Sequence, residues 1–168
     1  MKKFFLATLL IVMMSAATAL AANWGQIYTD QNDNVIYFDM DSVKVSFIDS
    51  TREDVTFSAV FRMDYSDRGR KALIDWYRDY SIVPADIESL SYDISTIQFK
   101  REGNKRYYHI AERVSYTAGG RPIADMHYTS SDANWQEIPV ASLVDVEYFE
   151  ANLIVEGKLY KRIDSENL

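Results

Sequence analysis

Two histidines are the first candidates for chemistry in this sequence. His109 and His127 each lie within a run of alternating apolar and polar residues, which is typical of a β-strand. If a hairpin joins these two strands, the imidazoles could face each other and share a metal ion. The sequence offers no obvious third ligand for such a site. We therefore interpret both histidines as ordinary sheet residues and expect no metal site and no cofactor.

A second candidate is the acidic segment that begins at Asp30. Asp30, Asn32, Asn34 and Asp41 occupy positions 1, 3, 5 and 12 of a calcium-loop spacing. Position 6 is Val35, where a calcium loop needs glycine for its sharp turn. The same residues also suit a hairpin turn without an ion. We expect the hairpin turn, with no calcium.

Nucleophilic catalysis finds no support in the sequence. The chain contains no cysteine, and neither a G-x-S-x-G nor an H-E-x-x-H motif occurs. Paired carboxylates are frequent, but an acidic protein carries them on its solvated surface. We expect a protein that is not an enzyme.

A basic and aromatic cluster is the remaining candidate, and it suggests binding. Lys105, Arg106, Tyr107 and Tyr108 combine the residue types that most often carry interface energy. The ordinary interpretation is a strand entrance whose cations extend toward solvent. If Tyr108, Ile110 and Val114 face the core, strand alternation prevents Arg106 and Tyr107 from sharing that face. The predicted partner-binding residues are therefore Lys105, Arg106 and Tyr107, with Tyr107 the tyrosine that is free.

The elements that would position these residues alternate between strands and helices. Period-two patterns predict strands at 24–29, 35–40, 55–65, 90–100, 106–117 and 123–128, and the alternation of Val43, Val45 and Phe47 could continue the meander after the second strand. The segment 101–105 has the composition of a hairpin loop. Strands, helix, strands and helix in that order predict an α+β fold: a curved antiparallel sheet of about six strands with one mid-chain helix and one C-terminal helix packed on it.

Each predicted helix has a start signal and an apolar stripe. Ser66 caps the first helix, whose stripe is Leu73, Trp76, Tyr77 and Tyr80, and Pro84 stops it. Ser142 caps the second, and Gly157 ends it. The apolar stripe of the second helix is expected to pack on the sheet through Leu143, Val146, Phe149 and Leu153. The three tryptophans, Trp24, Trp76 and Trp135, are expected to pack the core or seal its edges.

The N-terminus predicts export. Lys2 and Lys3 precede an apolar run from Phe4 to Met14, and Ala19-Leu20-Ala21 is a signal-peptidase pattern. We expect residues 1–21 to be a cleaved signal peptide, residues 22–157 to form one domain and residues 158–168 to be a charged tail. No membrane span is expected after cleavage. The 168 residues carry 25 acidic and 18 basic side chains, so nucleic acid is not an expected partner.

Several segments together resemble the surface-adhesin protein E-like domain of diderm bacteria. The resemblance covers nearly all of the chain from Trp24 to about Leu153, and it depends on the order of individually weak motifs. These are Trp24-Gly25-Gln26-Ile27, Val35-Ile36-Tyr37-Phe38-Asp39-Met40-Asp41-Ser42-Val43, Tyr65-Ser66-Asp67-Arg68-Gly69-Arg70-Lys71, Ser89-Leu90-Ser91-Tyr92-Asp93 and Trp135-Gln136-Glu137-Ile138-Pro139.

This resemblance implies a curved sheet with a C-terminal helix on its concave side. It also implies a surface protein that binds host extracellular-matrix or plasma proteins such as vitronectin and laminin, often as a homodimer. Related adhesins carry a disulfide and a lipidated cysteine, and this sequence has neither. The sequence thus predicts an exported binding module in the periplasm or at the cell surface. The alternative is a periplasmic structural or envelope-homeostasis protein without a host ligand.

Overall fold

The computed structural model describes residues 22–49, 51, 53–80, 83–130 and 134–166, with side chains described as far as residue 158. The predicted signal peptide lies outside these residues. The predicted α+β class is confirmed, with a seven-stranded antiparallel sheet and two helices packed on it. The strands are β1 (Trp24–Thr29), β2 (Val35–Ile48), β3 (Val55–Asp64), β4 (Leu90–Glu102), β5 (Lys105–Thr117), β6 (Pro122–Thr129) and β7 (Gln136–Glu137).

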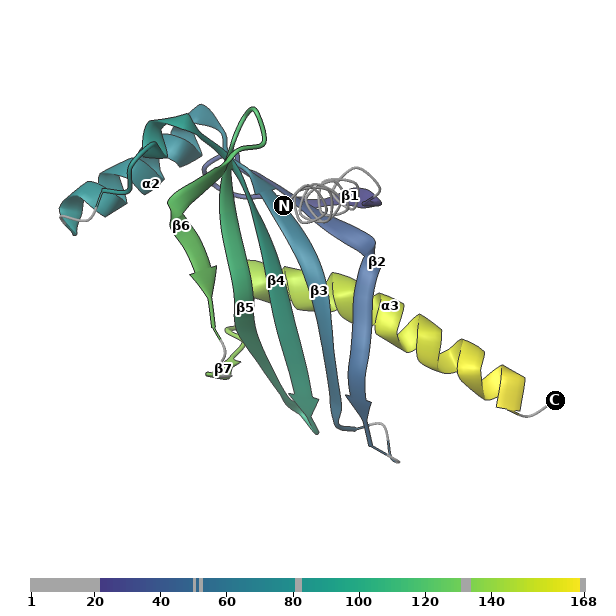
Figure 1. Ribbon diagram of the computed structural model, residues 1–168. Coiled ribbons are helices and arrows are strands. Elements are labelled where there is room, and N and C mark those ends of the chain that lie inside the picture. The colour runs from purple at the N-terminus through teal and green to yellow at the C-terminus, as the bar shows by residue number, and fades with distance from the viewer. Residues whose placement is uncertain (1–21, 50, 52, 81–82, 131–133, 167–168) are drawn as a thin grey trace, which may run out of the picture.

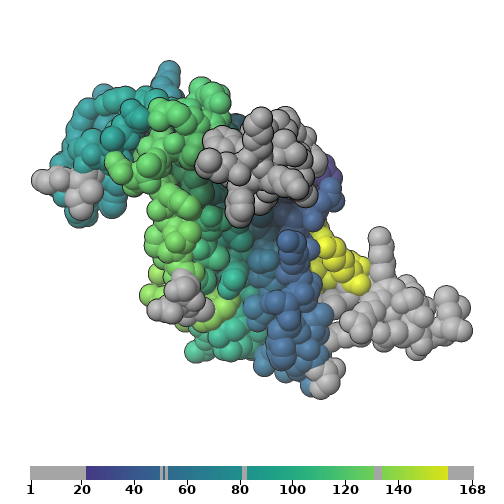
Figure 2. All heavy atoms as spheres, in the orientation of Figure 1, coloured from purple at the N-terminus to yellow at the C-terminus, as the bar shows by residue number. Residues whose placement is uncertain are grey.

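The sheet follows the order of the chain from β1 to β6, and the short β7 adds to β5 beside the start of that strand. Helix α2 (Asp67–Asp79) leaves the sheet beyond β3, and a short 3-10 turn, η1 (Ile87–Ser89), leads into β4. Helix α3 (Leu143–Glu166) crosses one face of the sheet (Figure 1). We call the face under α3 the helix face and the other the open face. Figure 2 looks onto the open face.

Alternation along β4 separates these two faces. Asp93, Ser95, Ile97 and Phe99 are buried on the helix face, whereas the residues between them are half-buried on the open face. The core beneath α3 is aromatic: the Phe57 ring lies 5.3 Å from that of Phe99. A sheet with one covered and one wetter face is common among antiparallel sheets.

A β-bulge in β5 changes which of its residues reach the helix face. Ile97 pairs with Ile110 and Ser95 pairs with Arg113, so one extra residue of β5 lies between these two pairs. The bulge keeps Ile110 and Arg113 on the same face. It moves Val114 to the open face, so of the three residues Tyr108, Ile110 and Val114 only the first two lie on the helix face.

Helix α2 begins as the sequence predicted. Ser66 accepts a hydrogen bond from the Gly69 amide and caps the helix. Ile74 is buried, with Leu73 and Tyr77 packed in the same cluster. Trp76 does not pack in the core as expected for a tryptophan that packs the core or seals its edges: its side chain is 51% exposed. Its ring lies tilted against the exposed Tyr80 ring, with the centroids 4.7 Å apart.

Helix α3 differs from the prediction in its length and in its buried stripe. It continues through Gly157 to Glu166, so Gly157 does not end it and the expected tail begins as helix. Its buried apolar residues are Tyr148, Ala151 and Val155, with Val144 packed beside them. The predicted Phe149 and Leu153 are instead 53% and 66% exposed.

The buried stripe of α3 differs from the predicted one because this helix carries apolar residues on several sides. Residue spacing alone therefore allows either set of residues to face the sheet. Polar contacts with the sheet select one of them. Asp145 pairs with Arg106 of β5, Glu156 pairs with Arg101 of β4, and the Lys158 ammonium donates to the Val43 carbonyl of β2. These contacts fix the rotation of the helix as it crosses from β5 to β2.

Candidate ligand-binding cleft

A cleft opens on the helix face where β4, β5 and β6 pass between the two helices. It consists of an inner cavity of about 190 Å³ beside the first turns of α3 and an outer cavity of about 480 Å³ between α2 and β6. Both cavities are lined by Tyr65, Asp93, Ile110 and Arg113, so they adjoin. The two together are within the usual size of small-molecule sites.

Asp93 lies at the floor of the cleft and is 5% exposed. Its Oδ2 accepts a hydrogen bond of 2.8 Å from the Tyr65 hydroxyl. Its Oδ1 is buried and has no hydrogen bond of good geometry from the described residues. Burial raises the pKa of Asp93, although hydrogen bonding from Ser115 and Tyr65 and the charge of Arg113 oppose that rise. The pKa of Tyr65 is also raised, first by burial and then by Asp93.

Glu147 faces this floor from the first turns of α3. It is 7% exposed and lines the inner cavity. No described residue hydrogen-bonds or ion-pairs with its carboxyl group. Burial raises the pKa of Glu147 to about 8, and Arg113 lowers it only in part. At neutral pH this carboxyl group is therefore mostly protonated inside the cleft.

Arg113 supplies a cation to the cleft, and the other arginine that lines it, Arg62, is paired with Asp64. The Nε of Arg113 donates to the Ser95 hydroxyl at 3.1 Å, which fixes the guanidinium over β4. The Arg113 side chain is exposed, and no described carboxylate forms an ion pair with it. Its terminal nitrogens therefore remain available as a planar donor pair, the geometry that recognises carboxylates and phosphates.

The walls of the cleft are apolar and aromatic. Leu143 and Val144 of α3 line the inner cavity with Tyr108. The outer cavity is lined by the side chains Leu73, Tyr77, Met126 and Tyr128. Apolar walls around a few convergent polar groups are typical of ligand sites. Chemically, this arrangement can hold a small molecule that has both polar and apolar parts.

The predicted binding residues Lys105, Arg106 and Tyr107 do not line this cleft. Lys105 is exposed at the two-residue turn Gly103-Asn104. Tyr107 lies on the open face, where the Lys100 ammonium is 5.1 Å from its ring centroid. Alternation separates Tyr107 from Arg106, as the sequence predicted.

Arg106 has a structural contact that the sequence did not reveal. Its Nη1 donates to Asp145 Oδ1 at 2.6 Å, and the Asp145 side chain is 9% exposed. The guanidinium also lies over the rings of Tyr148 and Phe149, at 5.2 and 4.9 Å. Arg106 therefore fixes α3 on the sheet and is not free for a partner.

The two histidines do not meet. His127 of β6 pairs with Val114 of β5, whereas His109 lies five positions further along β5 from the β5–β6 turn and pairs with Gln98 of β4. His109 is buried, and its ring lies 6.0 Å from that of Trp135. His127 contacts Glu112 at 3.2 Å. Among the described residues, no three histidine or acidic side chains are grouped to hold a metal ion.

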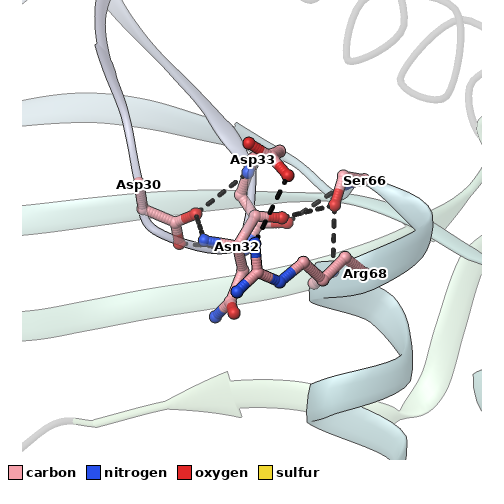
Figure 3. Close-up of polar contacts among 7 residues, drawn as sticks. Asp30, Asn32, Asp33, Ser66 and Arg68 are labelled. Atoms are coloured by element: carbon pink, nitrogen blue, oxygen red, sulfur yellow. Dashed lines mark hydrogen bonds and ion pairs between the residues drawn. The ribbon is translucent and has the colours of Figure 1, made fainter.

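The acidic segment at Asp30 is a structural loop that fastens the β1–β2 turn to helix α2 (Figure 3). Asp30 Oδ1 accepts hydrogen bonds from the amides of Asn32 and Asn34. The Asn34 side chain accepts from the Ser66 amide, and Ser66 donates to the Asn32 carbonyl. A Cβ on Gly69 would lie 1.7 Å from Asn34 Oδ1, so this close approach requires glycine.

Sequence reasoning missed the residues of the cleft. Asp93 and Ser95 are polar residues at core positions of a clear strand pattern, and Glu147 lies within an apolar helix. A polar residue at a buried position is a functional signal. Arg113 was not detectable, because the bulge that turns it into the cleft has no pattern in the sequence.

No family model, no curated protein and no solved structure matches this chain. The described helices include none that is long and apolar enough to cross a membrane. The geometry of the cleft is therefore the main basis for a functional proposal.

Proposed function

We propose that this protein is an exported, non-enzymatic binding module that takes its ligand in the cleft between α2 and α3. The observation that carries the proposal is that Asp93 Oδ1 is buried and unpaired at the cleft floor, with the buried Glu147 and the exposed Arg113 lining the same cavity. Buried polar groups left unpaired cost about 1–3 kcal/mol each. A ligand that pairs with the buried Asp93 and Glu147 would recover that free energy, and the exposed Arg113 can hold an anionic group of the same ligand.

The place of the protein in the cell is a further part of the proposal. The predicted signal peptide supports export to the periplasm or the cell surface. The resemblance to surface-adhesin protein E-like domains supports host matrix or plasma proteins as partners. Lys105 and Tyr107 remain the residues proposed to contact such a partner, because Lys105 is exposed at the hairpin and Tyr107 lies half-buried on the open face.

The test compares the exported wild-type protein with one variant that fills the cleft and one that does not. Ile110→Trp places an indole among the cleft residues, whereas Val114→Trp adds the same group to the open face of the same strand. Each protein is incubated with the small-molecule fraction of the cell envelope and with serum and matrix proteins, and retained ligands are detected by native mass spectrometry.

We expect wild type and Val114→Trp to retain a small-molecule ligand that Ile110→Trp loses, with all three proteins folded. Equal retention by all three would overturn the cleft as the site. If none retains a ligand, the binding module itself is overturned in favour of the structural, envelope-homeostasis alternative. Protease shaving of intact cells separates the two locations, because a surface protein is removed and a periplasmic one is spared.

A further inference from the structure

The inner part of the cleft brings a cation without an ion pair and two buried carboxyl groups to the same small cavity. Arg113 of β5 donates a hydrogen bond to Ser95 of β4. Asp93 is the next residue of β4 on the same face as Ser95, and Glu147 of α3 lines the same cavity. Residues two apart on a strand are about 7 Å apart. Positive and negative groups are thus within reach of one small molecule.

We propose that the cleft binds a free α-amino acid, with its carboxylate on Arg113 and its ammonium at Asp93 and Glu147. This inference rests on the proposed function, because it names the ligand of the same cleft. In an α-amino acid a single carbon atom separates the two charged groups. That compactness suits a cavity in which Arg113 and Asp93 flank Ser95.

Charge balance excludes the simpler ligands. An amine without a carboxylate would bring a second cation beside Arg113, and an acid without an ammonium would face the carboxylate of Asp93. Either would add net charge to a site with apolar walls, where uncompensated charge is costly. A zwitterion adds none and supplies hydrogen-bond partners for every one of these groups.

The side chain of the amino acid has a place in the outer cavity. Leu73 and Tyr77 of α2 face Met126 and Tyr128 of β6 across that cavity. These walls favour an apolar or aromatic side chain, because its burial removes apolar surface from water. The acidic Asp125 also lines this cavity, but its Oδ2 already accepts a hydrogen bond from the Ala85 amide.

The experiment is calorimetric titration of the exported wild-type protein with each of the twenty amino acids. For each amino acid that binds, two derivatives follow: its amide, which lacks the carboxylate, and its N-acetyl form, which lacks the ammonium. We expect at least one amino acid with an apolar or aromatic side chain to bind, and each derivative to bind at least about 10-fold more weakly.

Variants then assign the two halves of the ligand. Arg113→Gln changes an exposed side chain, so the fold should survive, and affinity for the amino acid should fall at least about 10-fold while affinity for the amide changes little. Asp93→Asn should lower the affinity for the N-acetyl form less than the affinity for the free amino acid, because the N-acetyl form has no ammonium to lose. The melting temperature of the variant must first show that it is folded. The matched control is Arg121→Gln, an exposed arginine that pairs with Asp86 outside the cleft, and it should leave affinity unchanged.

Two outcomes overturn the inference. One is that no amino acid binds at concentrations up to about 10 mM. The other is that the amide or the N-acetyl form binds as tightly as the parent. If wild type still retains an envelope or host ligand that Ile110→Trp loses, the binding module stands and the ligand class is wrong. If it retains none, both proposals fail.

Discussion

Replacing Glu147 by glutamine should change how the stability of this protein depends on pH. Glutamine has the shape of the protonated carboxyl group and cannot ionise. Burial raises the pKa of Glu147 from its ordinary value of 4.5 to about 8. Between these two values the folded protein holds a proton that the unfolded chain has released. Wild type therefore loses stability as the pH rises through this range.

The size of the effect follows from the two pKa values. The difference between about 8 and 4.5 is roughly 3.5 pH units, and each unit corresponds to about 1.36 kcal/mol. From pH 5 to pH 8, the free energy of unfolding of wild type should fall by about 3–4 kcal/mol relative to the Glu147→Gln variant. This is a large part of the total stability of a domain of this size.

Urea unfolding of both proteins at pH 5, 7 and 8 measures this difference directly. The two proteins should be similar at pH 5, and the variant should be clearly more stable at pH 8. Glu150→Gln is the control, because it removes a carboxylate from the same helix without changing the lining of the cleft. If the gap between wild type and Glu147→Gln stays constant from pH 5 to 8, Glu147 is not held protonated in the cleft.

Other substitutions and additions test the remaining contacts. Tyr148→Ala should cost about 3–5 kcal/mol in urea melts, whereas Phe149→Ala should cost about 1 kcal/mol or less, because the ring is half exposed. Equal losses would mean that α3 is rotated from its described position. Gly69→Ala should cost about 2–3 kcal/mol, because its Cβ would collide with Asn34; an unchanged melting temperature would contradict the close approach. Millimolar calcium or zinc should not raise the melting temperature over a chelated control, and a rise of several degrees would point to an ion at the Asp30 loop or elsewhere.

The strands were predictable because each carries a clear period of two. The segment 55–65 alternates along its whole length, and the structure gives β3 at Val55–Asp64. Ser66 was recognisable as a cap because an oxygen side chain precedes a helical pattern. These features are local, and short-range spacing is enough to reveal them.

The rotation of α3 was not predictable in the same way. Its sequence has apolar residues on several sides, and the choice among them depends on Arg101, Arg106 and Val43, which are distant in the chain. The cleft was not predictable for the same reason, because its residues come together only in the folded chain. Asp93 and Glu147 are far apart in sequence, and the bulge that turns Arg113 toward them becomes visible only when β4 and β5 are paired.

The central claim is that Asp93, Arg113 and Glu147 form a binding site, and amide chemical-shift mapping tests it most directly. Isotope-labelled exported protein is titrated with an equimolar mixture of the twenty amino acids, and the amide signals are followed. The account predicts that the largest shifts occur along 93–95 of β4, 110–115 of β5 and 143–148 of α3. Shifts centred on other residues, or no shifts at saturating concentrations, would contradict it.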